Sequence, residues 1–105
     1  MKVYAVLVTY GNRYHLLTEV LSALLKMDVS KIIIVNNNMA ETSYQELSKF
    51  IKKHSKKITL LNQETNTGSA KGYKTGIEFA VKQKDCECIW LLDDDNKPYK
   101  NALDG

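Results

Sequence analysis

The chain has 105 residues, which is long enough for one domain with one hydrophobic core and too short for two. Hydrophobic residues make up 44% and charged residues 26%, as in an ordinary soluble globular domain. The net charge of +3 comes mostly from scattered lysines, so the composition does not indicate nucleic acid as a partner. No apolar run approaches the roughly 20 residues that cross a bilayer, so we expect no transmembrane segment.

A strand and a helix are predicted first, and a second strand follows them. The run at 2–10 is β-branched and apolar, which predicts a strand buried on both faces. Leucines and valines recur at three- and four-residue spacing over 16–25, which predicts an amphipathic helix. The apolar run at 31–35 predicts another buried strand. We expect this strand to end at three asparagines, 36–38, because asparagine favours turns.

The alternation continues through the second half of the chain. Ser43, followed three residues later by Glu46, has the form of a capping box that would open a second helix. A short strand is predicted at 57–61. The polar loop at 62–72 then opens a third helix, and a fourth strand is predicted at 88–92.

The fold class follows from this order of elements. Strands and helices that alternate in this way predict an α/β, Rossmann-like fold with a mainly parallel sheet and helices on both faces. Ligands of such open sheets bind beyond the carboxyl ends of the strands, near the point where the strand order reverses. We therefore expect the polar segments after the four strands to converge on one edge: 9–12, 36–38, 62–68 and 93–95.

Three consecutive aspartates follow the last predicted strand. Hard cations such as Mg²⁺ and Mn²⁺ prefer oxygen ligands, and Mg²⁺ usually takes one or two protein carboxylates together with phosphate oxygens and water. Alternate side chains of an extended segment share a face, so Asp93 and Asp95 could hold one metal ion while Asp94 turns aside. A solvated acidic turn before a proline is the alternative, and the triplet alone leaves both interpretations open.

Glycines are placed unusually for a nucleotide-binding sheet. The first strand is followed by neither a GxGxxG turn nor a Walker-type phosphate loop. Instead Gly68, Gly72 and Gly76 are spaced four residues apart, which places them on one helix face. We expect Gly72 and Gly76 to permit close packing of the helix on the sheet, and Gly68 to shape the site from the loop.

The two cysteines, Cys86 and Cys88, are separated by one residue. A disulfide at this spacing would be strained, and a CxC pair without a second ligand pair is a poor zinc site. We therefore expect free thiols and a cytoplasmic protein, with peripheral attachment at the inner membrane face also open.

Four segments, in this order, resemble the amino-terminal half of a family 2 glycosyltransferase of the GT-A fold: VLVTYGNRYHLLTEVLSALL, KIIIVNNNMAET, NTGSAKGYKTGIEFA and IWLLDDDNKP. The rhamnosyltransferase-like or galactofuranosyltransferase-like branch is the most similar. The resemblance implies that 1–105 form a single nucleotide-sugar-binding domain, truncated before the acceptor-binding half. The implied reaction is inverting transfer of a hexosyl or related sugar to a glycan or lipid-linked acceptor, as in cell-wall or surface polysaccharide biosynthesis.

The resemblance also implies which residues bind. The implied nucleotide-sugar-binding set comes from all four polar segments: Thr9, Tyr10, Asn12, Asn36, Asn66, Gly68, Lys71, Asp93 and Asp94. Asp95 and Asp93 are the implied ligands of a Mg²⁺ or Mn²⁺ ion. Asn36 stands where the family often has an aspartate that contacts the base, so UDP- and dTDP-linked sugars both stay open.

The catalytic base is left unassigned, because no segment matches the part of the family that carries it. A non-catalytic nucleotide-sugar-binding module, which would need another segment or chain for activity, is therefore the alternative. A nucleotidyltransferase would need a glycine- and arginine-rich loop after the first strand, and TYGNRYH does not supply one. An apolar sheet edge left bare by the absent half would be compatible with a homo-oligomer.

Overall fold

The computed structural model describes residues 2–63 and 69–94, with only the backbone of residues 69 and 70. Strands and helices alternate throughout this part of the chain, as the sequence predicted. The elements in chain order are β1 (Val3–Gly11), α1 (Tyr14–Leu25), β2 (Lys31–Met39), α2 (Glu41–Lys52), β3 (Ile58–Asn62), α3 (Ser69–Val81) and β4 (Cys88–Asp93).

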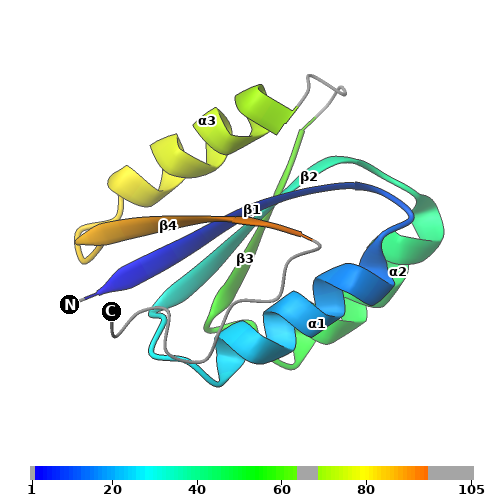
Figure 1. Cartoon of the computed structure of the whole chain (residues 1–105), viewed down its shortest axis with the longest axis horizontal. Coiled ribbons are helices and arrows are strands. Elements are labelled where there is room, and N and C mark those ends of the chain that lie inside the picture. The colour runs from blue at the N-terminus through cyan, green and yellow to red at the C-terminus, as the bar shows by residue number, and fades with distance from the viewer. Residues whose placement is uncertain (1, 64–68, 95–105) are drawn as a thin grey trace.

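The four described strands form one parallel sheet in the order β3-β2-β1-β4. Helices α1 and α2 cover one face of this sheet and α3 covers the other (Figure 1). The chain builds outward from β1 to β3 and then returns across the sheet to place β4 on the far side of β1. The strand order therefore reverses between β1 and β4, where open α/β sheets bind ligands. The predicted fold class is confirmed.

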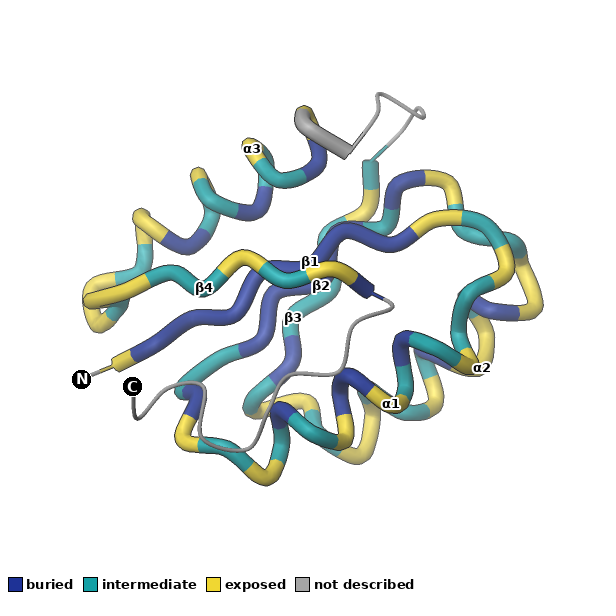
Figure 2. The backbone as a smooth tube through the Cα atoms, viewed as in Figure 1, coloured by how far each residue is buried: buried dark blue, intermediate teal, exposed yellow. Residues whose placement is uncertain are grey.

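The core lies on both faces of the two central strands, β1 and β2, which are buried along most of their length (Figure 2). Leu7 and Ile34 pack toward α1 and α2, while Val6 and Ile33 pack toward α3. Strand β4 lies at the edge and is more exposed, with Leu91 half exposed. The central strands therefore form a rigid base whose carboxyl ends carry the polar residues.

Helix α3 lies very close to the sheet because two of its residues have no side chain. A Cβ atom on Gly76 would lie 2.5 Å from Val6 Cγ1, and one on Gly72 would lie 2.9 Å from Val8 Cγ1. Real Cβ atoms almost never approach other heavy atoms this closely. The prediction that Gly72 and Gly76 serve close helix–sheet packing is confirmed.

The prediction that the second strand ends at the asparagines is wrong. Strand β2 continues to Met39, and Asn36 pairs with Thr9 on one side and Asn62 on the other. Backbone hydrogen bonds to two neighbouring strands outweigh the turn preference of asparagine here. That preference appears only at Asn38, which adopts a positive φ of 74°.

The predicted capping box is also wrong. Helix α2 begins at Glu41, its N-cap residue is Ala40, and no side chain caps it. Ser43 therefore lies inside the first turn, where it is buried and its Oγ donates a hydrogen bond to Asn12 Oδ1 at 2.6 Å. This contact ties α2 to the loop after β1 in place of a local cap.

Cys86 and Cys88 are free thiols, the first half-buried and the second exposed. In the described part of the chain, none of the helices combines the length and the apolar character that a membrane crossing requires.

Candidate functional site

The carboxyl ends of the strands bring together polar residues that are far apart in sequence. Thr9 on β1 pairs with Asn36 on β2, which in turn pairs with Asn62 on β3. On the other side of β1, Val8 pairs with Asp93 at the end of β4. The predicted convergence on one edge is thus present among the described residues of all four segments.

Asp94 is the most enclosed of these polar groups, with 5% of its surface exposed. Its Oδ2 accepts hydrogen bonds from Thr9 Oγ1 and from Arg13 Nε, both at 2.9 Å. Its Oδ1 accepts a third hydrogen bond, from Arg13 Nη2 at 3.0 Å. The guanidinium therefore binds the carboxylate through two parallel hydrogen bonds, the strongest geometry for this pair. Both Asp94 oxygens are satisfied within the protein.

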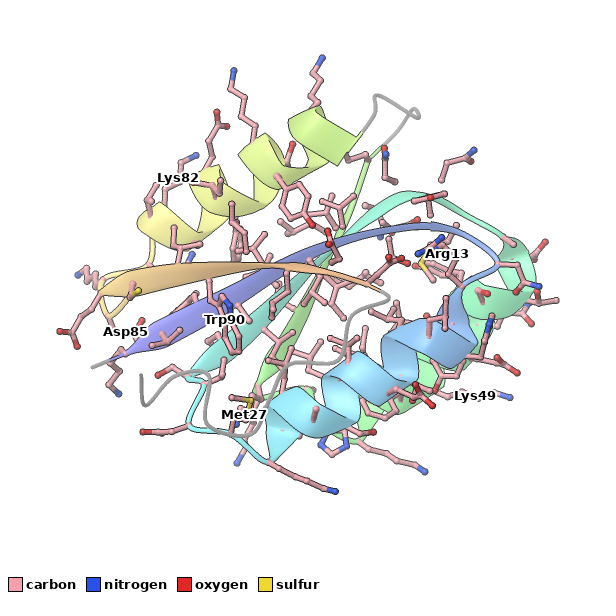
Figure 3. All side chains as sticks on the ribbon, in the orientation of Figure 1. Arg13, Met27, Lys49, Lys82, Asp85 and Trp90 are labelled. Atoms are coloured by element: carbon pink, nitrogen blue, oxygen red, sulfur yellow. The ribbon has the colours of Figure 1, made fainter. Side chains whose placement is uncertain are left out.

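Arg13 has a central place at this edge that the sequence analysis missed. It lies between β1 and α1, and Figure 3 shows its side chain near the carboxyl ends of the central strands. It is the only arginine of the chain. The available signal was a lone arginine two residues beyond the first strand, in a chain with three consecutive aspartates after its last predicted strand, because arginine matches a carboxylate better than lysine does.

Tyr10 is an exposed aromatic residue near the carboxyl end of β1. It is 48% exposed, and the Arg13 guanidinium carbon lies 4.9 Å from the centre of its ring. Arg13 Nη1 also donates a hydrogen bond to the Tyr10 hydroxyl at 3.3 Å. One guanidinium therefore contacts both the aromatic ring near the end of β1 and the carboxylate that follows β4.

The side chain of Asp93 lies near different groups from those that bind Asp94. It is exposed, and the hydroxyl of Tyr73 on α3 lies 3.4 Å from its Oδ1. The same hydroxyl donates a shorter hydrogen bond, of 2.6 Å, to the carbonyl oxygen of Leu92. Adjacent aspartates diverge, as the alternation of an extended segment predicted. The hydroxyl of Tyr73 thus holds the end of β4 from the α3 side.

The asparagines of the edge are held by other protein groups. Asn36 Nδ2 donates to Asn62 Oδ1 at 2.9 Å, and Asn36 Oδ1 accepts from the backbone N–H of Met39 at 2.8 Å. Asn12 is exposed and accepts the hydrogen bond from Ser43. These contacts hold the side-chain amides of Asn36 and Asn12 and leave each with further hydrogen-bonding capacity.

The remaining predicted residues divide into two groups. Lys71 is exposed on the first turns of α3. Asn66, Gly68 and Asp95 lie outside the described residues, so their assigned roles stay predictions.

The family of the chain follows from comparison with known sequences. The model of glycosyl transferase family 2 matches residues 5–104. The chain belongs to glycosyl transferase family 2. No curated protein matches it.

Two solved structures share the fold of this family 2 domain. The crystal structure of residues 1–349 of S. aureus TarS aligns with a TM-score of 0.76 and 24% identity over 99% of the present chain. A second crystal structure of S. aureus TarS gives the same TM-score, identity and coverage. The present chain spans 30% of the first TarS chain and 18% of the second. The likeness shows the GT-A fold.

Hard divalent cations prefer oxygen ligands, and the described part of this edge carries the carboxylates of Asp93 and Asp94. Within the residues that the structure describes, no group of three or more His, Cys, Asp or Glu side chains could hold a metal ion. Mg²⁺, however, usually needs only one or two protein carboxylates. Asp94 is already bound by Thr9 and Arg13, whereas Asp93 is exposed at the edge. Among the described aspartates of the triplet, Asp93 is the one whose carboxylate lies at the surface of this edge.

Proposed function

We propose that this chain is the donor-binding domain of an inverting family 2 glycosyltransferase and that it binds a nucleoside diphosphate sugar with a divalent cation. The observation that carries the proposal is the position of Asp93 and Asp94. Asp93 ends β4 and Asp94 follows it, beside the end of β1, where the strand order reverses and open sheets of this kind bind ligands. Membership of the family supplies the chemistry that such an edge would serve.

The nucleoside is assigned to the carboxyl ends of β1 and β2. Tyr10 offers a half-exposed ring on which a base or ribose can pack, and its neighbour Thr9 would contribute main-chain groups, since its hydroxyl binds Asp94. Asn36 retains one N–H and one lone pair beyond its protein contacts, so it can both donate to and accept from a pyrimidine. This capacity suits UDP- and dTDP-linked sugars. Asn12, exposed after β1, would lie at the rim of the same pocket.

The diphosphate and the sugar are assigned to the acidic segment. Asp93, together with Asp95, would hold Mg²⁺ or Mn²⁺, which supplies positive charge to stabilise the leaving diphosphate. Lys71, exposed on α3, is a second positive group for a phosphate. Asn66 and Gly68 would complete the pocket from the loop before α3. Asp94 would then act near the ribose and sugar mainly by fixing the geometry of this segment.

Sugar transfer needs a catalytic base, and no segment of this chain matches the part of the family that carries one. We propose that the complete reaction transfers the sugar to a glycan or lipid-linked acceptor, in a cytoplasmic, rhamnosyltransferase-like branch of surface polysaccharide synthesis. The alternative is a binding module that acts with another chain. Strand β4 lies at the edge of the described sheet with Leu91 half exposed, which is compatible with a second copy or a further segment beside it.

Isothermal titration calorimetry of UDP, dTDP and GDP, each with and without Mn²⁺, tests the proposal. We expect UDP or dTDP to bind, and to bind more tightly with Mn²⁺. Asp93→Asn should remove most of this metal dependence, whereas Asp28→Asn, an exposed aspartate in the turn after α1, should leave it unchanged.

Failure of all three nucleotides to bind, with or without the metal, would show that the edge is not a donor site. Binding of UDP-sugars without any hydrolysis over hours would favour the binding-module alternative.

A further inference from the structure

The ion pair of Arg13 and Asp94 is largely enclosed. The side chain of Asp94 is 6% exposed and that of Arg13 is 25% exposed. Three hydrogen bonds, two from Arg13 and one from Thr9, bind the carboxylate from the side of β1. The guanidinium therefore cancels the charge of one aspartate of the acidic segment and fixes the direction of its side chain.

We infer that Arg13 is a positioning residue that keeps Asp94 out of the metal-binding set. The inference rests on the proposed function, because it takes the acidic segment to be the place where a divalent cation binds. With Asp94 neutralised, the segment presents fewer negative charges to a cation. A site with few carboxylates holds Mg²⁺ or Mn²⁺ weakly until a diphosphate adds its own oxygens. The pair would thus make metal binding depend on the arrival of the nucleotide.

Loss of Arg13 would reverse this arrangement. Asp94 would lose the two hydrogen bonds from Arg13 and keep the one from the Thr9 hydroxyl. Its buried charge would then be uncompensated, which is strongly unfavourable. Asp94 directly follows β4, in a turn, so its side chain can swing outward without breaking the sheet. Once outside, it would lie beside Asp93 and add a second carboxylate to the exposed edge.

Arg13 also links the two parts of the candidate pocket. The same guanidinium lies 4.9 Å from the ring of Tyr10 and donates to its hydroxyl. A change at Arg13 should therefore weaken nucleotide binding while it strengthens binding of the metal alone. A purely structural role would weaken both.

The test measures Mn²⁺ affinity without nucleotide, by electron paramagnetic resonance of the free ion, in four variants of the chain. Arg13→Gln should bind Mn²⁺ about fivefold more tightly than wild type, because a second carboxylate near a divalent ion adds a modest, solvent-screened attraction. Asp94→Asn should bind it more weakly, since Arg13 then adds an uncancelled positive charge. Arg13→Gln/Asp94→Asn should return to within about twofold of wild type, because the two charges are removed together. Arg13→Lys, which keeps the charge, should stay near wild type and serves as the matched control.

The double variant decides the matter, and urea unfolding of each variant shows whether it is folded. If Arg13→Gln does not fold, the comparison of Asp94→Asn with Arg13→Lys still shows whether the charge of the pair sets Mn²⁺ affinity. If Asp94→Asn and the double variant both lose Mn²⁺ as completely as Asp93→Asn, Asp94 is itself a ligand and the inference is overturned. Absence of Mn²⁺ binding to both wild type and Arg13→Gln would overturn it as well.

The measurement separates the two proposals. A chain that binds no nucleotide, but shows the expected order of Mn²⁺ affinities, would refute the donor site and support the role of Arg13. A chain that binds UDP with Mn²⁺, but shows equal Mn²⁺ affinities in all variants, would support the donor site and refute the role of Arg13.

Discussion

Of the two glycines that face the sheet from α3, Gly76 leaves the less room for a side chain, and its substitution by alanine tests how strongly the fold depends on this close packing. The new methyl group would lie 2.5 Å from Val6 Cγ1 and 3.2 Å from Val35 Cγ2. Both valines are fully buried on the two central strands. Because valine has little rotamer freedom, the clash can be relieved mainly by lifting α3 away from the sheet.

Two opposing effects set the size of the change. Alanine is favoured over glycine inside a helix by about 1 kcal/mol. Overpacking of a well-filled core costs about 1–3 kcal/mol and occasionally more. Since the shortest contact at Gly76 is 2.5 Å, we take the upper part of that range and expect a net loss of about 1–2 kcal/mol in the free energy of unfolding.

Urea unfolding followed by circular dichroism, and by the fluorescence of the single tryptophan, Trp90, measures this loss. Gly72→Ala is the matched control, because it gives the same gain in helix propensity with a milder contact of 2.9 Å, to Val8 near the end of β1. Val6→Ala in the Gly76→Ala background should cost less than Val6→Ala alone, since it removes the clashing methyl groups.

If Gly76→Ala is as stable as wild type, or more stable, the close approach of α3 does not constrain the fold. Gly76→Ala should also weaken ligand binding at the candidate site. Helix α3 carries Tyr73, whose hydroxyl donates a hydrogen bond to the carbonyl oxygen of Leu92, so a shift of α3 would disturb the end of β4. Weaker Mn²⁺-dependent nucleotide binding by Gly76→Ala, under conditions where it is fully folded, would confirm this link.

Three further predictions concern single polar groups. Thr9→Val keeps the shape of a fully buried side chain but removes a donor to Asp94, so it should lower the free energy of urea unfolding by about 1–3 kcal/mol; an unchanged value would mean that Arg13 alone satisfies the carboxylate. Burial and the hydrogen bond to Asp85 raise the pKa of Tyr4 from 10.0 to about 12. The protonated Tyr4 hydroxyl therefore stabilises the fold fully below pH 10, and this contribution is lost as the pH rises through about 12. The stability difference between wild type and Tyr4→Phe should therefore shrink over that window in urea titrations, and a constant difference would contradict the assignment. Asn38→Ala should lower stability by about 1 kcal/mol, because its φ of 74° is costly for alanine, whereas Asn38→Gly should change it little in the same assay; equal losses would point to the side chain instead.

Much of the fold is encoded in short-range patterns. Uniformly apolar runs identified the strands and three- to four-residue spacing identified the helices, because these patterns reflect which faces of one element are buried. Parallel topology then required the polar ends of the strands to meet, so their convergence on one edge could be predicted before any contact was known. The four-residue spacing of Gly72 and Gly76 places both on one helix face, and it therefore indicated close packing of that face on the sheet.

Local patterns were misleading where partners from elsewhere in the chain competed with local preferences. The asparagines at 36–38 favour a turn, but β2 continues through them to Met39, since Asn36 pairs with Thr9 and Asn62 and Met39 pairs with Gly11. Ser43 has the spacing of a cap, yet it lies within α2 and donates to Asn12, which is 31 residues away in sequence.

The detailed arrangement of the site was decided by tertiary structure alone. Arg13 and Asp94 are 81 residues apart, and their hydrogen bonds depend on the register of β1 against β4 and on the course of two loops. No spacing within a single element encodes such a contact. The sequence therefore identified three consecutive aspartates at the end of the fourth strand, and the folded chain showed that one of them, Asp94, is bound by the only arginine.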